Sequence, residues 1–130
     1  MKIMVCIDGS NVAKDALDLA KKRAKALGAE IYLLTSMVGG SDVPIDAFEK
    51  AEKRLKKAKN NVKAEGIPCE SLLSVRGLDA GEELVRLAKE EKIDEIYIGI
   101  RRRSKVGKFI FGSTAQYVIL EAPCPVVTVR

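Results

Sequence analysis

The apolar positions of this chain fall into five short runs, separated by four longer segments in which apolar residues recur at helical spacing. The first run, residues 3–7, has no polar alternation, which is typical of a strand buried on both faces of a parallel sheet. Further strands are predicted at residues 30–37, 69–75, 93–98 and 126–129. Strands that alternate with helices form parallel βαβ units, so the pattern predicts an α/β fold with helices on both faces of the sheet.

Four helices are predicted between these strands, and several of their ends carry capping residues. The first begins after Ser10, a favoured N-cap, and ends at Gly28. A long charged helix falls within residues 41–65, and a third opens at Asp79 and Glu82, which have the spacing of a capping box. The first helix is expected to bury Val12, Ala16, Leu17, Leu19, Ala20, Ala24 and Leu27. The last helix is expected to bury Ala115, Val118, Ile119 and Leu120.

Right-handed crossovers limit a five-stranded parallel sheet to a few strand orders, of which 3-2-1-4-5 is favoured here. In that order the winding of the chain reverses between the first and fourth strands. Ligands of such folds bind at that point, outside the carboxyl ends of the strands. Asp8 directly follows the first strand, and Gly99 directly follows the fourth. The predicted order therefore places one crevice between these two segments.

Composition narrows the chemistry of that crevice. The length of 130 residues is that of one domain, and the chain has no histidine. Histidine is the commonest general base and metal ligand, so Ser/His/Asp and Cys/His catalytic sets are excluded. Cys6, Cys69 and Cys124 form no C-x-x-C pair, and we expect three buried thiols in a reducing cytoplasm. No apolar run approaches the ~20 residues of a membrane span, so no membrane partner is expected.

Positive charge gathers in one segment, residues 99–114, which contains no acid. Its five cations, equal in number to the formal net charge of +5, are Arg101, Arg102, Arg103, Lys105 and Lys108. The segment ends in Gly112-Ser113-Thr114, which is predicted to begin the last helix. Glycines let the backbone approach a ligand, and first-turn N–H groups face an anion. These features predict a phosphate site, the alternative being a solvated basic turn whose glycines only punctuate the chain.

The spacing of this segment closely resembles the nucleotide motif of the universal stress protein family. That motif is a glycine, two residues, a second glycine, nine residues, and a glycine followed by Ser or Thr. This chain has Gly99, two residues, Arg102, nine residues, then Gly112 and Ser113. The opening V-C-I-D-G-S and the ending P-C-P-V-V-T-V are similar to the family's first strand and turn and to its last strand. The resemblance covers essentially the whole chain.

The resemblance implies a Rossmann-like three-layer α/β sandwich, usually a homodimer, whose members divide into ATP binders and non-binders. It implies that Gly99, Gly112 and Ser113 line the phosphates, that Asp8 lies by the adenosine, and that Ser36 lies near the adenine. Asp8 also has two interpretations from its position alone. One interpretation is a ligand contact, in which Asp8 bonds a ribose hydroxyl or helps to hold Mg²⁺. The other is a local structural role, in which Asp8 forms an Asx-turn or N-cap that starts the first helix, and the ligand role and the structural role are compatible.

Arg102 is the chief departure from the family, because ATP-binding members have their second glycine there. Its side chain would either fill the space of a phosphate or clamp the phosphate, with Gly107 restoring the flexibility lost upstream. The fit of arginine to phosphate and four neighbouring cations favour binding. We therefore expect an ATP-binding stress-response sensor or regulator whose phosphate site includes Thr114. No motif supports efficient catalysis, although the sequence leaves slow ATP hydrolysis open.

The alternative function is a dimeric interaction module that binds no nucleotide and uses residues 101–108 on a protein or polyanion. Nucleic acid is the least favoured partner, because the spacing of Phe109 and Phe111 is more typical of core residues than of a stacking surface. The last strand, residues 126–129, is apolar and predicted to lie at a sheet edge. Pairing with its symmetry mate would cover that edge, which predicts a two-fold homodimer. The sequence identifies no downstream protein partner.

Overall fold

The computed structural model describes residues 1–37, 43–75, 79–100 and 112–130. It contains one parallel sheet whose strand order, β3-β2-β1-β4-β5, is the predicted one. The strands are β1 (Lys2–Cys6), β2 (Glu30–Ser36), β3 (Cys69–Ser74), β4 (Glu95–Gly99) and β5 (Val126–Val129). The central strand β1 pairs with β2 in the register Met4 to Tyr32, and with β4 in the register Met4 to Ile96. The carboxyl ends of all five strands therefore point the same way.

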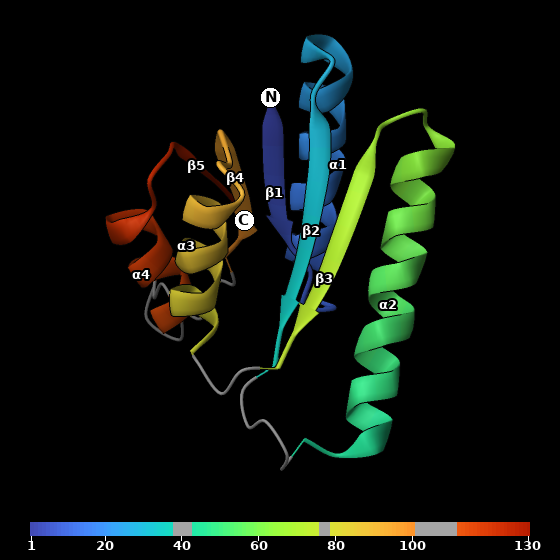
Figure 1. The fold of residues 1–130 in the computed structure, drawn as a ribbon, viewed down its shortest axis with the longest axis vertical. Helices are drawn as coiled ribbons and strands as arrows, with labels where there is room; N and C mark the ends of the chain where they lie inside the picture. Colours follow the sequence, from blue (N-terminus) through green and yellow to red (C-terminus); the bar gives the residue numbers. More distant parts are fainter. Residues whose placement is uncertain (38–42, 76–78, 101–111) are drawn as a thin grey trace.

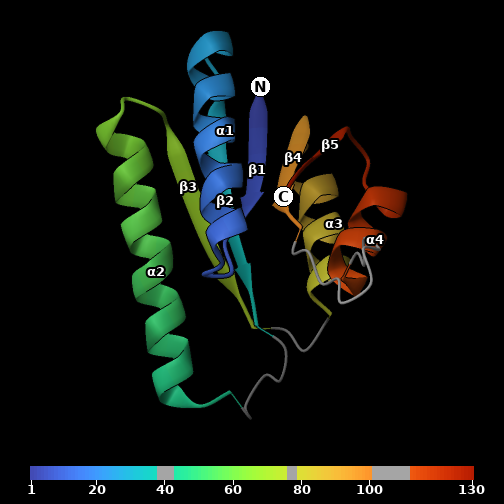
Figure 2. The same ribbon diagram turned by 180° about the vertical axis from the view of Figure 1, so that it is seen from behind.

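Helices cover both faces of this sheet, giving three layers (Figures 1 and 2). They are α1 (Asn11–Leu27), α2 (Ile45–Ala64), α3 (Ala80–Glu90) and α4 (Ser113–Glu121). Figure 2 shows α1 and α2 side by side over one face, while α3 and α4 lie over the other. This division follows from right-handed crossovers, because the chain winds outwards from β1 to β3 and then returns to β4 and β5. No helix within the described ranges is long and apolar enough to cross a membrane.

The continuous apolar run at the start of the chain is buried on both sides, as predicted. Ile3 and Val5 pack into the cluster beneath α1 and α2, and Met4 packs into the cluster beneath α3 and α4. All three side chains are fully buried. Successive residues of a strand point to opposite faces, so a central strand with helices on both sides needs an apolar residue at every position.

The predicted helix ends are largely confirmed. Ser10 is the N-cap of α1 and accepts a hydrogen bond from the Ala13 N–H at 3.2 Å. Gly28 ends this helix in the left-handed conformation, with φ of 65°. Asp79 caps α3, but its carboxylate accepts from the Gly81 N–H at 2.8 Å rather than from Glu82, which a capping box would require.

Two predictions about buried positions and element bounds are wrong. Ile119 and Leu120 in α4 are 42% and 77% exposed, and Leu19 and Leu27 in α1 are also exposed. They lie on the sides of their helices that no described neighbouring element covers. The fourth strand begins at Glu95 rather than at residue 93, because the chain is still completing the end of α3 at that point: the Ile93 N–H donates to the Ala88 carbonyl at 2.9 Å.

Candidate functional site

The carboxyl ends of β1 and β2 open into a cavity of about 620 Å³, hereafter the crevice. It lies at the end of the molecule where the strands stop and α2, α3 and α4 begin, the lower end in Figure 1. Its described lining residues are Cys6, Ile7, Asp8, Thr35, Ser36, Met37, Val43, Pro44, Ala47, Lys50, Ala51, Arg54, Ala80 and Thr114. Small-molecule sites commonly have volumes of about 300–1,000 Å³ and are lined by apolar side chains with a few polar groups. The volume and the lining of the crevice both fit this description.

Asp8 begins the tight turn that connects β1 to α1. Its Oδ1 accepts hydrogen bonds from the Ser10 N–H at 2.9 Å and from the Ser10 hydroxyl at 2.6 Å. This is the Asx-turn that the position of Asp8 predicts, and Ser10 in turn caps α1. The turn needs Gly9, which has a φ of 84° that L-residues with a side chain rarely adopt. The carboxylate is therefore held at the mouth of the crevice by local hydrogen bonds.

Hydrogen bonds between neighbouring strand ends hold the floor of the crevice. The buried Thr35 hydroxyl donates to the Ile7 carbonyl at 2.7 Å, and the Ile7 N–H donates to the Leu34 carbonyl at 2.8 Å. One strand further out, the Met37 N–H donates to the Ser74 carbonyl at 2.8 Å. The bonds extend strand pairing past the last regular residues, so that the side chains lining the floor have a rigid base.

A buried carboxylate fixes the beginning of α3 beside the crevice. Glu83 is 1% exposed and accepts a hydrogen bond from the Ser74 hydroxyl at the end of β3, at 2.9 Å. It also pairs with Arg86 one turn further along α3. Because a buried carboxylate is tolerated only when it is paired and hydrogen-bonded, these contacts tie α3 to the strand end. Ala80, on the first turn of α3, is thereby placed at the crevice wall.

Two cations from α2 line the crevice, and the sequence interpretation missed both of them. Lys50 and Arg54 lie one turn apart on the same side of α2 as Ala47 and Ala51, which also line the cavity. The Arg54 guanidinium lies directly over the β1–α1 turn, since a Cβ added to Gly9 would be 2.7 Å from its Cζ. The helical spacing of these four residues was the only signal in the sequence, and it gives no information about which element the cations face.

The start of α4 forms a further wall. Thr114 lines the crevice, and α4 begins at Ser113 with Gly112 in the N-cap position. Gly112 is in extended conformation, with φ of −62° and ψ of 157°, and it supplies no side-chain oxygen to the first-turn N–H groups. These groups, together with the helix dipole, favour an anion.

Gly99 has a packing role that the sequence did not indicate. It ends β4 beneath the first turn of α1, where an added Cβ would lie 2.6 Å from the Val12 carbonyl carbon and 2.8 Å from the Ala13 nitrogen. Gly99 is not among the described residues that line the crevice. Its absent side chain lets β4 and α1 approach closely, and contact with phosphate stays a prediction.

The crevice thus brings together Asp8, Ser36 and Thr114, which are far apart in the sequence and were all predicted for the site. Gly112 and Ser113 stand at the helix start beside Thr114. Arg102, Gly107 and the rest of the basic segment lie outside the described residues, so the structure does not test their predicted roles.

The thiol in the crevice is not a reactive group. Burial, with a smaller contribution from the charge of Asp8, raises the pKa of Cys6 to about 12. Because the thiolate is the nucleophile and the metal ligand, Cys6 stays an inert thiol at neutral pH. Among the residues that the structure describes, no three His, Cys, Asp or Glu side chains are grouped so that they could hold a metal ion.

Comparison with known proteins agrees with this geometry. The sequence model of the universal stress protein family matches residues 1–130. The chain belongs to this family. A universal stress protein of Thermus aquaticus is 37% identical over 134 residues, covering 98% of this chain and 97% of its own length. A solved universal stress protein of Archaeoglobus fulgidus superposes with a TM-score of 0.90 at 36% identity, covering 100% and 98% of the two chains. A second structure from that organism, a universal stress protein in complex with dAMP, has a TM-score of 0.85 at 32% identity and covers 100% of this chain and 98% of its own.

Proposed function

We propose that residues 1–130 form one nucleotide-binding domain, and that the protein is a stress-response sensor or regulator which binds an adenine nucleotide, ATP in particular, in the crevice. The observation that carries the proposal is the meeting of Asp8, Ser36 and Thr114 around one cavity at the start of α4. The universal stress protein of Archaeoglobus fulgidus that was solved with dAMP supports it, as a relative of similar length and fold. A cytoplasmic location stays a prediction.

Each wall of the crevice suits one part of a nucleotide. The Asp8 carboxylate is placed to accept from ribose hydroxyls, and Ser36 lies at the end of β2, where the adenine would enter between apolar residues. The phosphates would lie at the start of α4 against Gly112, Ser113 and backbone N–H groups. Lys50 and Arg54 add positive charge from the opposite wall, an addition to the roles that the family resemblance implies.

We further propose that the basic segment completes the phosphate site. Arg102 would clamp a phosphate through its guanidinium instead of offering the backbone of a glycine, and Gly107 would restore the flexibility that is lost with that glycine. Mg²⁺ would accompany the phosphates of ATP, with phosphate oxygens as its main ligands, because Mg²⁺ is usually bound through one or two carboxylates plus substrate phosphates.

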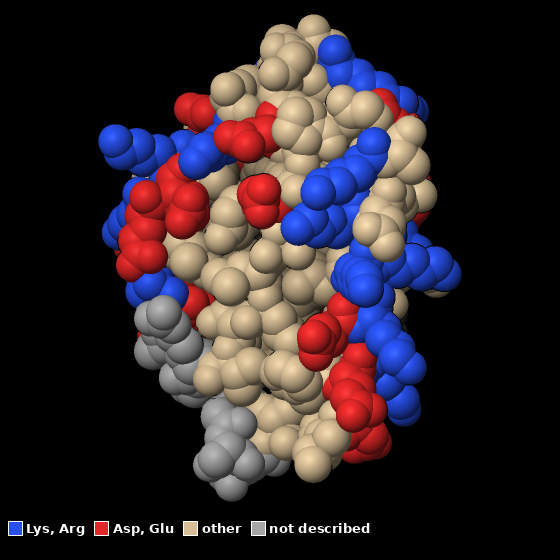
Figure 3. All heavy atoms as spheres, turned by 45° about the vertical axis from the view of Figure 1, so that its right-hand side comes forward, with Lys and Arg blue, Asp and Glu red and all other residues tan. Residues whose placement is uncertain are grey.

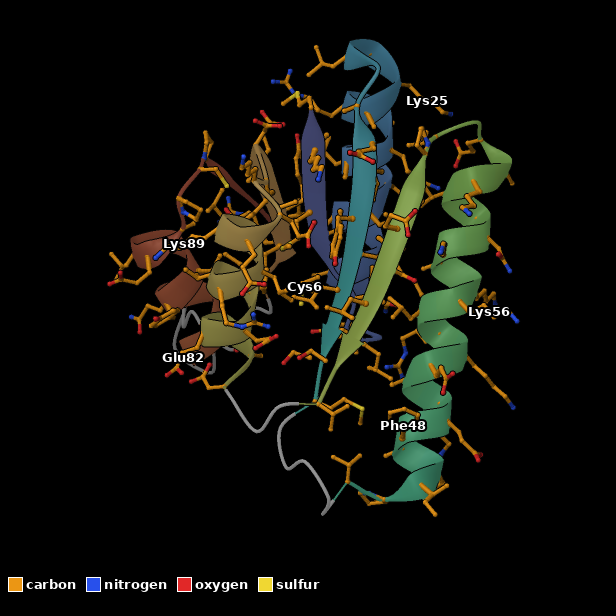
Figure 4. The ribbon with its side chains drawn as sticks, in the orientation of Figure 1. Cys6, Lys25, Phe48, Lys56, Glu82 and Lys89 are labelled. Atoms are coloured by element: carbon orange, nitrogen blue, oxygen red, sulfur yellow. The ribbon has the colours of Figure 1, made fainter. Side chains whose placement is uncertain are left out.

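Calorimetric titration of nucleotide-free protein with AMP, and with ATP and Mg²⁺, tests the proposal. Two substitutions act on opposite walls: Arg54→Ala, and Gly112→Val, whose added Cβ meets no atom of the described residues within 4 Å. We expect Gly112→Val to abolish ATP binding and Arg54→Ala to weaken it at least about tenfold. Lys56→Ala is the matched control, since Figure 4 shows Lys56 pointing away from the crevice, and it should bind like the wild type.

If neither AMP nor ATP with Mg²⁺ gives a heat of binding, the proposal is rejected in favour of the alternative function. That alternative rests on the five cations of residues 101–108, which have no acid among them. In that case the segment would bind an acidic protein or a polyanion, with an affinity that falls steeply as salt rises. Replacing Arg101, Arg102 and Arg103 with glutamine would then remove the interaction.

We also propose that the protein is a homodimer joined through β5. This strand is at the edge of the sheet and pairs with β4 on one side, and Val127 and Val129 are only partly buried. Edge-to-edge pairing with a second copy would satisfy its outer backbone groups. Sedimentation should give a dimer mass for the wild type and a monomer mass for Thr128→Pro, because proline removes a donor from this edge. A concentration-independent wild-type monomer would contradict the proposal.

A further inference from the structure

A second cavity of about 480 Å³ lies between α1 and α2 and adjoins the crevice at Arg54. Figure 2 shows these two helices side by side over the same face of the sheet. We call this cavity the α1–α2 groove and define it by its apolar floor of Ala13, Leu17 and Ala58 and its basic rim of Lys14, Arg54 and Lys57. The groove and the crevice share only Ile7 and Arg54 among their described lining residues.

Side-chain contacts limit the groove at both ends. At one end the Lys21 ammonium donates to the Asn61 side-chain oxygen at 2.8 Å, which bridges α1 to α2. At the other end the Arg54 guanidinium lies over Gly9. The stretch of α1 between the two ends, from residue 11 to residue 21, is about 15 Å long at 1.5 Å per residue. A groove of this length, limited at both ends, suits a small elongated ligand rather than a peptide that must continue past both bridges.

Positive charge is in excess among the described residues of the rim. Lys14, Arg54 and Lys57 have no ion-pair partner within the part of the chain that the structure describes. Asp18, the acidic residue in the lining, lies 3.4 Å from the Lys21 ammonium, which also contacts Glu65 at 2.7 Å. Figure 3 shows lysine and arginine side chains interspersed with acidic side chains on the side of the molecule that lies to the right in Figure 1. An anionic ligand would therefore find unpaired cations on both helices.

The floor of the groove selects against ligands that are polar throughout. Both walls are formed mainly by the middle turns of helices, where backbone N–H and C=O groups are already bonded within the helix. The Ser10 hydroxyl is already bonded, donating to Asp8 and accepting from Ala13. Ala13, Leu17 and Ala58 offer no side-chain hydrogen bond, so polar groups of a sugar or nucleobase laid against this floor would lose hydrogen bonds to water without replacement. An alkyl chain would instead cover the floor and the alkyl stems of the lysines.

We infer that the α1–α2 groove is a binding site for an amphiphilic organic anion, with an acyl chain along the floor and its carboxylate against the rim cations. The positive charge of the rim indicates an anionic head group on the ligand. The limited length and the apolar floor of the groove indicate an elongated apolar body. This site is separate from the proposed nucleotide site and does not depend on nucleotide binding. Its occupant would lie beside Arg54, which also lines the crevice, so the two ligands would meet at one side chain.

Calorimetric titration with dodecanoate below its micelle concentration tests the inference. We expect saturable binding to one site, no binding of dodecyltrimethylammonium, and binding of octanoate at least about fivefold weaker, because each buried methylene contributes up to a factor of about four. The double variant Lys14→Glu/Lys57→Glu should weaken dodecanoate binding at least about tenfold. The matched control, Lys22→Glu/Lys56→Glu, reverses two exposed charges on the same helices outside the groove and should bind within about twofold of the wild type.

Three results would overturn the inference. The first is the absence of saturable dodecanoate binding. The second is an equal loss in both double variants, which would mean that net charge alone attracts the anion. The third is a combination of two observations: AMP displaces dodecanoate, and dodecanoate binds the Lys14→Glu/Lys57→Glu variant as tightly as the wild type. That combination would place the acyl chain of dodecanoate in the crevice. Because the readout is dodecanoate itself, failure of nucleotide binding would leave this test intact.

Discussion

Gly99→Ala tests whether the close approach of β4 and α1 is a requirement of the fold. The added Cβ would lie 2.6 Å from the Val12 carbonyl carbon, 2.7 Å from its oxygen and 2.8 Å from the Ala13 nitrogen. All three atoms are backbone, so no side-chain rotation relieves the overlap. Restoring an ordinary carbon–carbon separation of about 3.5 Å requires the first turn of α1 to move by roughly 1 Å. That turn carries Ser10 and, through it, the hydrogen bonds to Asp8.

Overpacking of this kind costs about 1–3 kcal/mol. In urea unfolding followed by far-UV circular dichroism at one fixed protein concentration, the midpoint should fall by roughly 1 M, given a slope of about 1–3 kcal/mol/M. The matched control is Gly112→Ala, whose Cβ meets no atom of the described part of the chain within 4 Å and which should lose only about 0.5 kcal/mol through weaker N-capping. If Gly99→Ala unfolds at the wild-type midpoint, or loses no more than the control, the packing argument is refuted.

Three further predictions concern single side chains. Thr35→Val removes the donor to the Ile7 carbonyl and should cost about 1–3 kcal/mol in urea unfolding, and an unchanged midpoint would show that the bond is dispensable. Hydrogen bonds from Lys21 and Lys25 lower the pKa of Glu65 from 4.5 to about 2, so its contribution to stability is complete above pH 4.5 and lost as the pH falls towards 2. Stability of Glu65→Gln should depend less on pH across that interval, and identical curves would contradict this. Burial raises the pKa of Cys6 to about 12, so its thiolate fraction at pH 8 is far below that of an ordinary cysteine. Iodoacetamide should therefore label Cys6 only in urea, and mass spectrometry of the labelled protein checks this.

Much of the fold follows from local patterns in the sequence. The buried run of β1, the caps Ser10 and Asp79, and the stop at Gly28 each depend on a few adjacent residues, and the structure confirms them. The strand order also followed, because alternating strands and helices with right-handed crossovers leave few arrangements. The switch point predicted a crevice between the carboxyl ends of β1 and β4. The described cavity lies at the end of β1, with Asp8 in its lining, but its neighbouring wall is the end of β2, and Gly99 is not among its described lining residues.

The remaining features depend on which elements face each other. Periodicity identified apolar stripes, but it could not show that Leu120 would stay exposed, because that depends on where neighbouring elements end. Likewise Lys50 and Arg54 belong to a long charged helix whose sequence does not show which of its charges face the crevice. They reach the crevice because α2 packs across β2 and β3 and so brings one of its sides over the end of β1.

The sequence by itself therefore determined the strands, most helix ends, the order of the sheet and the end of the sheet at which the crevice forms, because these follow from short-range spacing and chain handedness. Only the tertiary structure decided that Gly99 lies beneath α1, that Arg54 covers Gly9, and that a groove opens between α1 and α2. Each of these depends on the distance between elements separated by many residues. That distance is set by how side chains of two surfaces fit together, which no local pattern encodes.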